Sequence, residues 1–187
     1  MCPGMCLATS RREPTLVAPY DGSVVRPVVY LLCGLTASGK TTYARRLEAE
    51  GCVRLSIDEV VHARHGRHDV DYPASEYPRH YEEAVAEFDR RLVELLEAKR
   101  SVVFDHGLWR RSNRDRYKAL VEAHGGRWKL LYFKAEPSLL RARLAQRNME
   151  GGANALSVSD EMLKDFITRF EEPCGEGERV VGGADAT

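Results

Sequence analysis

Apolar residues follow two alternating patterns along the chain from residue 27 onward. Short continuous apolar runs predict strands that are buried on both faces, and longer segments with helical apolar spacing lie between them. The predicted strands are 28–33, 52–57, 101–105, 128–133 and 180–181. The predicted helices are 40–50, 58–65, 80–99, 113–124, 137–148 and 159–171. This alternation predicts a three-layer α/β fold with a parallel sheet of about five strands and right-handed crossovers.

The length of 187 residues predicts one domain at 27–187, preceded by a flexible or loosely docked extension at 1–26. The extension is rich in Pro, Gly, Ser and Arg, and it lacks the order of a signal peptide. The chain contains no run of about 18 apolar residues, so no membrane span is expected. The formal net charge of +0 gives no global attraction to nucleic acid or anionic membranes. The 5 cysteines lack zinc-finger spacing, so reduced thiols and a cytoplasmic location are expected.

A phosphate-binding loop lies between the first predicted strand and the first predicted helix. Its glycines let the backbone turn so that N–H groups point at phosphate oxygens, and the helix adds its positive amino end. Lys40 would contact the β- and γ-phosphates, and Thr41 would offer a hydroxyl to Mg²⁺. Nucleotide binding is expected, against the alternative of a glycine turn with an incidental lysine. The residues assigned to the nucleotide are Gly34, Leu35, Thr36, Ala37, Ser38, Gly39, Lys40, Thr41 and Thr42.

Two aspartates end the second and third predicted strands, at the sheet edge where the phosphate loop also falls. Ligands gather at the carboxyl ends of the strands in such sheets. Asp58 is interpreted as the general base that accepts the proton of a substrate hydroxyl, with a plain helix cap as the alternative. Asp105 is interpreted as the carboxylate that orients Mg²⁺ or its waters, with a strand-end turn residue as the alternative.

Two arginines on the helix predicted at 137–148 are candidates for phosphate contacts. Arg143 and Arg147 are four residues apart, so they share a helix face. Beside the glycine-containing break at 151–154, they suit a helical lid that closes over the transferring phosphate and stabilises developing charge. The alternative is a solvated basic face.

Histidines gather around the loop at 66–79. A glycine and the loop interrupt the helix between them, so a metal site is not favoured, and substrate contact or exposure is expected instead. The loop itself, which carries Tyr72 and Tyr77, is predicted to select the substrate. The histidines are His62, His65, His68 and His80.

Four segments resemble the AAA_33 group of small P-loop kinases. They are GLTASGKTT at 34–42, RLSIDEV at 54–60, VVFDHGLWRRSNRDRY at 102–117, and RARLAQRN followed by a helix that ends FEEP at 170–173. The group includes polynucleotide 5′-kinase domains, zeta-toxin-like kinases and chloramphenicol phosphotransferase.

The resemblance implies a P-loop NTPase fold that binds ATP. By the same resemblance, Asp58 would be the base that activates the acceptor hydroxyl. Asp105 would be the aspartate after the third strand, and Arg147 would be the lid arginine, with Arg143 as its neighbour. Relatives often carry Thr and Asn after the strand-three aspartate, where this chain has His106-Gly107-Leu108. That departure indicates a different acceptor.

These residues together predict an ATP- and Mg²⁺-dependent kinase that phosphorylates a hydroxyl of a small molecule such as an antibiotic, sugar or nucleoside. The second hypothesis is a polynucleotide 5′-hydroxyl kinase, which needs a basic groove with stacking aromatics. The net charge argues against a large groove of this kind, although the arginines at 110–116 mean that the polynucleotide-kinase hypothesis stays under consideration. The third is a nucleotide-dependent binding or switch protein with slow hydrolysis and no acceptor. The sequence leaves the oligomeric state open.

Overall fold

A computed structural model describes residues 26–68, 70–150 and 158–182 of the chain. The strands are β1 (Val28–Cys33), β2 (Val53–Leu55), β3 (Val102–Phe104), β4 (Arg127–Phe133) and β5 (Glu178–Val181). The helices are α1 (Lys40–Ala49), α2 (Ile57–His65), α3 (Tyr77–Glu97), α4 (Arg111–Ala123), α5 (Pro137–Glu150) and α6 (Asp160–Arg169), with a short 3-10 helix at Ala74–Glu76. The predicted alternation of strands and helices is confirmed.

The five strands form one parallel sheet in the order β2-β3-β1-β4-β5. The central strand is β1, whose Val29 pairs with Val102 of β3 on one side and with Trp128 of β4 on the other. The chain crosses from one side of β1 to the other between β3 and β4. The loop after β1 therefore opens at the point where the strand order reverses, which is the usual place for a ligand in an open α/β sheet.

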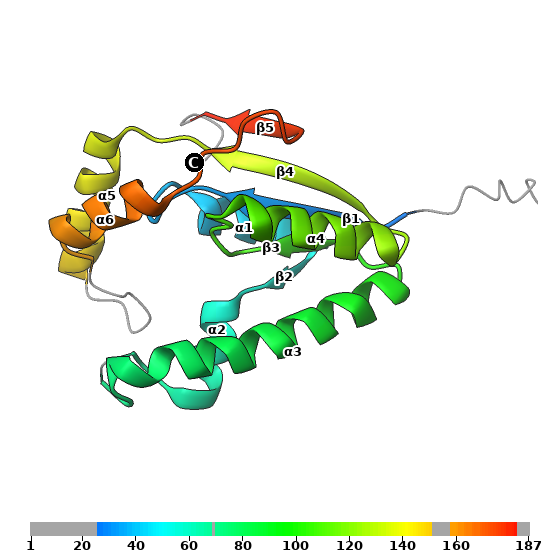
Figure 1. Ribbon diagram of the computed structural model, residues 1–187, viewed down its shortest axis with the longest axis horizontal. Helices are drawn as coiled ribbons and strands as arrows, with labels where there is room; N and C mark the ends of the chain where they lie inside the picture. Colours follow the sequence, from blue (N-terminus) through cyan, green and yellow to red (C-terminus); the bar gives the residue numbers. More distant parts are fainter. Residues whose placement is uncertain (1–25, 69, 151–157, 183–187) are drawn as a thin grey trace, which may run out of the picture.

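Helices cover both faces of the sheet, so the predicted three layers are present (Figure 1). Alternate residues of β1 serve the two faces, as the twofold side-chain period of a strand requires. Leu32 packs against Ala44 and Leu47 of α1. Leu31 belongs to the larger core on the other face, to which α3 and α4 contribute Phe88, Leu92, Leu96, Tyr117 and Val121.

Local differences from the predicted boundaries have simple causes. β2 is shorter than predicted because Ser56 caps α2, with its hydroxyl accepting a hydrogen bond from the N–H of Glu59. The helix cap given as the alternative role of Asp58 is therefore wrong, and Asp58 lies in the first turn of α2. α3 begins at Tyr77, earlier than predicted, because Pro78 in its first turn needs no N–H partner there.

The predicted lid corresponds to a pair of helices, α5 and α6, beside the phosphate loop (Figure 1). Ser159 caps α6, with its hydroxyl accepting a hydrogen bond from the N–H of Met162 at 3.2 Å. Leu35 and Ala37 of the phosphate loop pack against the core between the two helices. That core consists of Leu140, Leu144, Val158 and Leu163.

Two sequence-based expectations concern residues outside the described ones. They are the extension at 1–26, of which only Arg26 is described, and the glycine break at 151–154. Of the helices that the structure describes, none combines the length and the apolar character needed to cross a membrane.

Candidate active site

The phosphate loop leaves the end of β1 and turns directly into α1. Gly39 caps α1 with a φ of 104°, in the left-handed region that favours glycine. At Gly34 a Cβ would lie 2.8 Å from the carbonyl oxygen of Phe133, so a larger residue would force that strand away. Both glycines are thus required by the backbone. The loop and the amino end of α1 together have the geometry of an anion site.

The side chain of Lys40 folds back over the loop. Its Nζ donates hydrogen bonds to the carbonyl oxygen of Leu35 at 2.6 Å and to the hydroxyl of Ser38 at 3.3 Å. Burial lowers the pKa of Lys40 to about 8, although the carboxylates of Asp105 and Asp58 act to raise it. A desolvated ammonium group of this kind is stabilised when anionic oxygens approach it.

Asp105 follows β3, is buried, and has a partner on each carboxylate oxygen. Oδ1 accepts a hydrogen bond from the Thr41 hydroxyl at 2.9 Å, and Oδ2 accepts one from Arg54 Nη1 at 2.7 Å. Arg54 also forms ion pairs with Glu48 and Glu59. The structure thus joins the two residues assigned to the metal, and oxygen donors of this kind suit Mg²⁺.

Asp58 is exposed on α2 and faces α3. Its Oδ1 accepts a hydrogen bond from the Tyr77 hydroxyl at 3.3 Å. Burial, and then the charge of Asp58, raise the pKa of Tyr77, so this phenol remains a donor at neutral pH. The charge of Asp58 also acts to raise the pKa of Lys40, less than the charge of Asp105 does.

His106, directly after Asp105, adds a second polar group to this site. Its Nε2 lies 3.1 Å from the Tyr81 hydroxyl. Burial lowers the pKa of His106, although Asp58 and Asp105 act to raise it, so the imidazole is neutral at pH 7. The rings of Tyr77 and Tyr81 lie with their centroids 5.9 Å apart. An aromatic wall with neutral hydrogen-bonding groups therefore stands next to Asp58.

Both predicted lid arginines lie at the phosphate loop. Arg143 Nη1 donates a hydrogen bond to the carbonyl oxygen of Ala37 at 3.2 Å. Arg147 is half-buried, which lowers its pKa, and it lies close enough to Lys40 to lower the pKa of that lysine. α5 thus brings two guanidinium groups to the place where the loop would hold phosphate.

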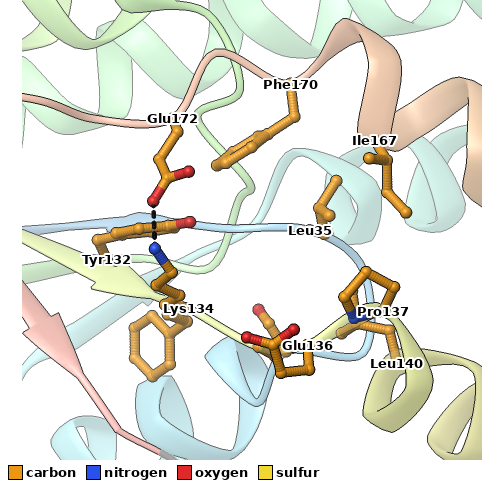
Figure 2. A pocket seen from close by; sticks show the side chains of 12 residues that line it. Leu35, Tyr132, Lys134, Glu136, Pro137, Leu140, Ile167, Phe170 and Glu172 are labelled. Atoms are coloured by element: carbon orange, nitrogen blue, oxygen red, sulfur yellow. Dashed lines mark hydrogen bonds and ion pairs between the residues drawn. The ribbon is translucent and has the colours of Figure 1, made fainter.

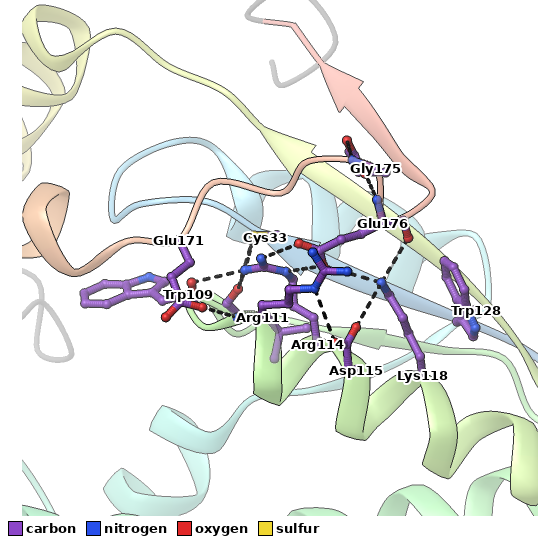
Figure 3. Close-up of polar contacts among 12 residues, drawn as sticks. Cys33, Trp109, Arg111, Arg114, Asp115, Lys118, Trp128, Glu171, Gly175 and Glu176 are labelled. Carbon is purple, nitrogen blue, oxygen red and sulfur yellow. Dashed lines mark hydrogen bonds and ion pairs between the residues drawn. The ribbon is translucent and has the colours of Figure 1, made fainter.

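A buried ion pair fixes the chain between β3 and α4 (Figure 3). Arg114 is fully buried and binds both oxygens of Glu176, with Nε–Oε2 at 2.8 Å and Nη2–Oε1 at 2.6 Å. Its Nη1 also donates to the carbonyl oxygens of Leu108 and Trp109. One guanidinium therefore ties the segment that carries His106 to the chain just before β5.

Two hollows flank the phosphate loop and share Ser38. The first, of about 240 Å³, lies between the end of β4, the start of α5 and the end of α6 (Figure 2). An ion pair between Lys134 and Glu172, at 2.8 Å, crosses its lining. The second, of about 220 Å³, extends from Ser38 past Arg143 to Val181 at the end of β5 and Gly182 after it.

Sequence reasoning missed three residues of this region: Arg54, Tyr81 and Arg114. Arg114 had a usable signal, because it shares helical spacing with the core residues Tyr117 and Val121 of α4. Solvent exposure, one of the two outcomes expected for the histidines, is wrong for His80. This residue is 3% exposed because it faces α2 from within α3.

A sequence model of the AAA_33 family, described as an AAA domain, matches residues 29–173. No curated protein matches the sequence. A protein from Chloroflexus aurantiacus J-10-fl, provisionally described as a kinase, has a similar structure with 18% identity and a TM-score of 0.67, over 83% of this chain and 85% of that one.

Two further solved structures are similar. A gluconokinase from Sinorhizobium meliloti 1021 has 20% identity and a TM-score of 0.54, over 85% of this chain and 83% of that one. Kti12 from Chaetomium thermophilum, in complex with ADP-AlF3, has 17% identity and a TM-score of 0.59, over 86% of this chain and 93% of that one. These likenesses establish a kinase-like P-loop fold.

Proposed function

Because the chain belongs to the AAA_33 family, we propose that it is an ATP-dependent kinase that transfers the γ-phosphoryl group to a hydroxyl of a small molecule. The observation that carries the proposal is the connection of the two aspartates to one edge of the sheet. Asp105 accepts a hydrogen bond from Thr41 of the phosphate loop at 2.9 Å. Asp58 accepts one from Tyr77, whose neighbour Tyr81 contacts His106, directly after Asp105. Transfer to an alcohol needs a base beside the residues that hold phosphate. A nucleotide-dependent switch needs the phosphate-holding residues alone.

In the proposed reaction, Asp58 accepts the proton of the acceptor hydroxyl while that oxygen attacks the γ-phosphorus. The new O–P bond forms as the bond from the γ-phosphorus to the bridging oxygen breaks, and ADP leaves with that electron pair. Lys40 and Arg147 stabilise the charge on the phosphoryl oxygens.

Thr41 and Asp105 are the residues that would hold Mg²⁺, directly or through its waters. The hydrogen bond of 2.9 Å between them supports this assignment, since it places two hard oxygen donors together. The ion would neutralise charge on the β- and γ-phosphates.

The base of the nucleotide is proposed to occupy the second hollow, beside Arg143. A planar guanidinium group stacks well on an aromatic ring. Ser38 belongs both to this hollow and to the phosphate loop, so a base placed there would remain continuous with the bound phosphates.

The acceptor is proposed to bind against Tyr77, Tyr81 and His106, next to Asp58. These three side chains offer ring faces and neutral hydrogen-bonding groups at pH 7. They suit an uncharged alcohol better than a polynucleotide, whose backbone requires a basic groove.

The proposed function is tested by incubating the purified chain with labelled ATP and fractionated pools of small-molecule alcohols. We expect label to move into an organic phosphomonoester, which mass spectrometry would identify. Label that moves only into oligonucleotide 5′ ends would support the polynucleotide kinase instead. Label that appears only as inorganic phosphate, with every pool, would contradict phosphoryl transfer.

The affinity for ATP is expected to fall as pH rises through the pKa of Lys40. The free protein loses the Lys40 proton near pH 8, whereas bound phosphates hold that proton. Binding therefore requires proton uptake above pH 8, and Kd should rise about tenfold between pH 7 and pH 9. Calorimetry in buffers with different ionisation enthalpies measures both the affinity and the uptake.

Lys40→Ala serves as the control for this pH dependence. It should bind ATP weakly, with an affinity that changes little between pH 7 and pH 9. A variant that retained the wild-type pH profile would place the titrating group elsewhere.

A further inference from the structure

The last turn of α2 and the early part of α3 bring together two histidines and a glutamate that the proposed phosphoryl transfer does not use. Each of His65, His80 and Glu83 offers one ligand atom, and the three atoms lie within 4.8 Å of one another. The imidazole rings of His65 and His80 stack, with centroids 3.6 Å apart and planes inclined by 19°. The chain between α2 and α3 returns so that His80 lies against α2, which spacing along the sequence does not reveal.

The ring nitrogens of this pair are incompletely satisfied. His65 Nε2 and His80 Nδ1 are both buried without a hydrogen-bond partner. A buried polar atom left in this condition destabilises the fold, because it has lost its hydrogen bonds to water without gaining another partner. A stacked pair of core histidines explains the ring contact, but it leaves two neighbouring ring nitrogens without a hydrogen-bond partner.

The second ring nitrogen of His80, Nε2, has a partner of the kind that is typical for a histidine that binds a metal. Its Nε2 lies 3.4 Å from Glu76 Oε2, so the proton is favoured on that nitrogen and the lone pair on Nδ1. A histidine that binds a metal usually gives its other N–H to a carboxylate, which fixes the ring and its tautomer. Tyr72, buried, packs edge-on against both rings and shields them from water.

The third donor is the carboxylate of Glu83, whose Oε2 lies 3.8 Å from His65 Nε2. Bonds of about 2.1 Å at a tetrahedral ion place two donors about 3.4 Å apart, so the side chains must close by up to about 1.4 Å. The in-plane lone pairs of two stacked rings do not converge on one ion, so the rings must also turn out of their stack while the half-exposed Glu83 side chain moves inward.

We propose that His65, His80 and Glu83 bind a divalent transition-metal ion that joins α2 to α3. Two imidazoles and one carboxylate form a donor set that suits Zn²⁺ and neighbouring metals better than Mg²⁺ or Ca²⁺. Water completes the coordination. The ion links the helix that carries Asp58 to the helix that carries Tyr77, so it stabilises the wall proposed to hold the acceptor.

The test is Zn²⁺ binding to the metal-free full chain, measured by calorimetry and by the rise in Tm. Glu83→Gln is compared with Glu82→Gln, the neighbouring exposed glutamate, and His65→Asn with His62→Asn on the same helix. Glu83→Gln and His65→Asn should each weaken Zn²⁺ binding at least about tenfold, while the two controls retain wild-type affinity. The cysteines are common to all variants and do not affect the comparison.

Cu²⁺ provides a second measurement that does not depend on stability. Electron paramagnetic resonance of the Cu²⁺-loaded chain should show coupling to two imidazole nitrogens, reduced to one in His65→Asn. Equal Zn²⁺ affinities for the test and control variants, or a Cu²⁺ spectrum that His65→Asn leaves unchanged, would overturn the proposal.

Discussion

Replacing Asp58 by asparagine is expected to lower phosphoryl transfer to the true acceptor by about 10²-fold or more, the usual contribution of a general base. Asparagine retains the size of the side chain and can still accept the hydrogen bond from Tyr77. It cannot take up the proton of the attacking hydroxyl. The measurement is kcat and KM for the acceptor, together with ATP affinity by calorimetry.

The two readouts separate catalysis from folding and nucleotide binding. ATP affinity should remain near that of the wild type, because Asp58 influences Lys40 only at a distance. Asp115→Asn, an exposed aspartate on α4, is the matched control and should leave kcat unchanged. Wild-type transfer by Asp58→Asn would remove the base from the mechanism, and with it the main distinction between this kinase and a switch protein.

Replacing Arg114 by methionine is expected to reduce the free energy of unfolding by about 3–5 kcal/mol, because the buried carboxylate of Glu176 is then left with the weaker contact with Lys118, at 3.5 Å. The side chains of Arg114 and Glu176 are 0% and 2% exposed, so water cannot replace the lost contacts. Urea denaturation at neutral pH measures the loss. Arg116→Met on the same helix is the control: its exposed pair with Asp89 should contribute less than about 1 kcal/mol.

The pH dependence of unfolding provides a further check on this ion pair. Hydrogen bonds from Arg114 hold the pKa of Glu176 below its usual value of 4.5. The pair therefore stabilises the fold fully above that value and loses its effect as pH falls through the lowered pKa. The difference in the free energy of unfolding between the wild type and Arg114→Met should therefore become smaller at acidic pH. Equal losses for Arg114→Met and Arg116→Met at neutral pH would contradict the assigned role.

The sequence predicted the parts of this molecule that depend on neighbouring residues. The glycines at 34 and 39 are required by the local conformation of the backbone. The run at 28–33 is continuously apolar because successive residues of the strand face the two cores in turn. Parallel strands then place Asp58 and Asp105 at the edge where the phosphate loop lies. Fold class and the chemistry of the loop follow from such short-range rules.

Pairings between distant residues were inaccessible, because no local pattern encodes them. Arg54 meets Asp105 across 51 residues, and Arg114 meets Glu176 across 62. The region at 110–116 contains four arginines, and only the fold determines which of them is buried. His80 presented the same difficulty, since its partner His65 lies on another helix beyond the intervening loop.

The central position of β1 has a consequence for the order in which the chain is made. Val28 donates a hydrogen bond to Ser101, 73 residues further along, and β4 on the other side follows later still. At about 5–20 residues per second, β1 waits about 4–15 s on the ribosome for its first neighbour. Throughout that interval an apolar strand has no sheet to enter, so early contact with a chaperone would protect it. The phosphate loop is thus synthesised among the first parts of the domain and becomes competent among the last.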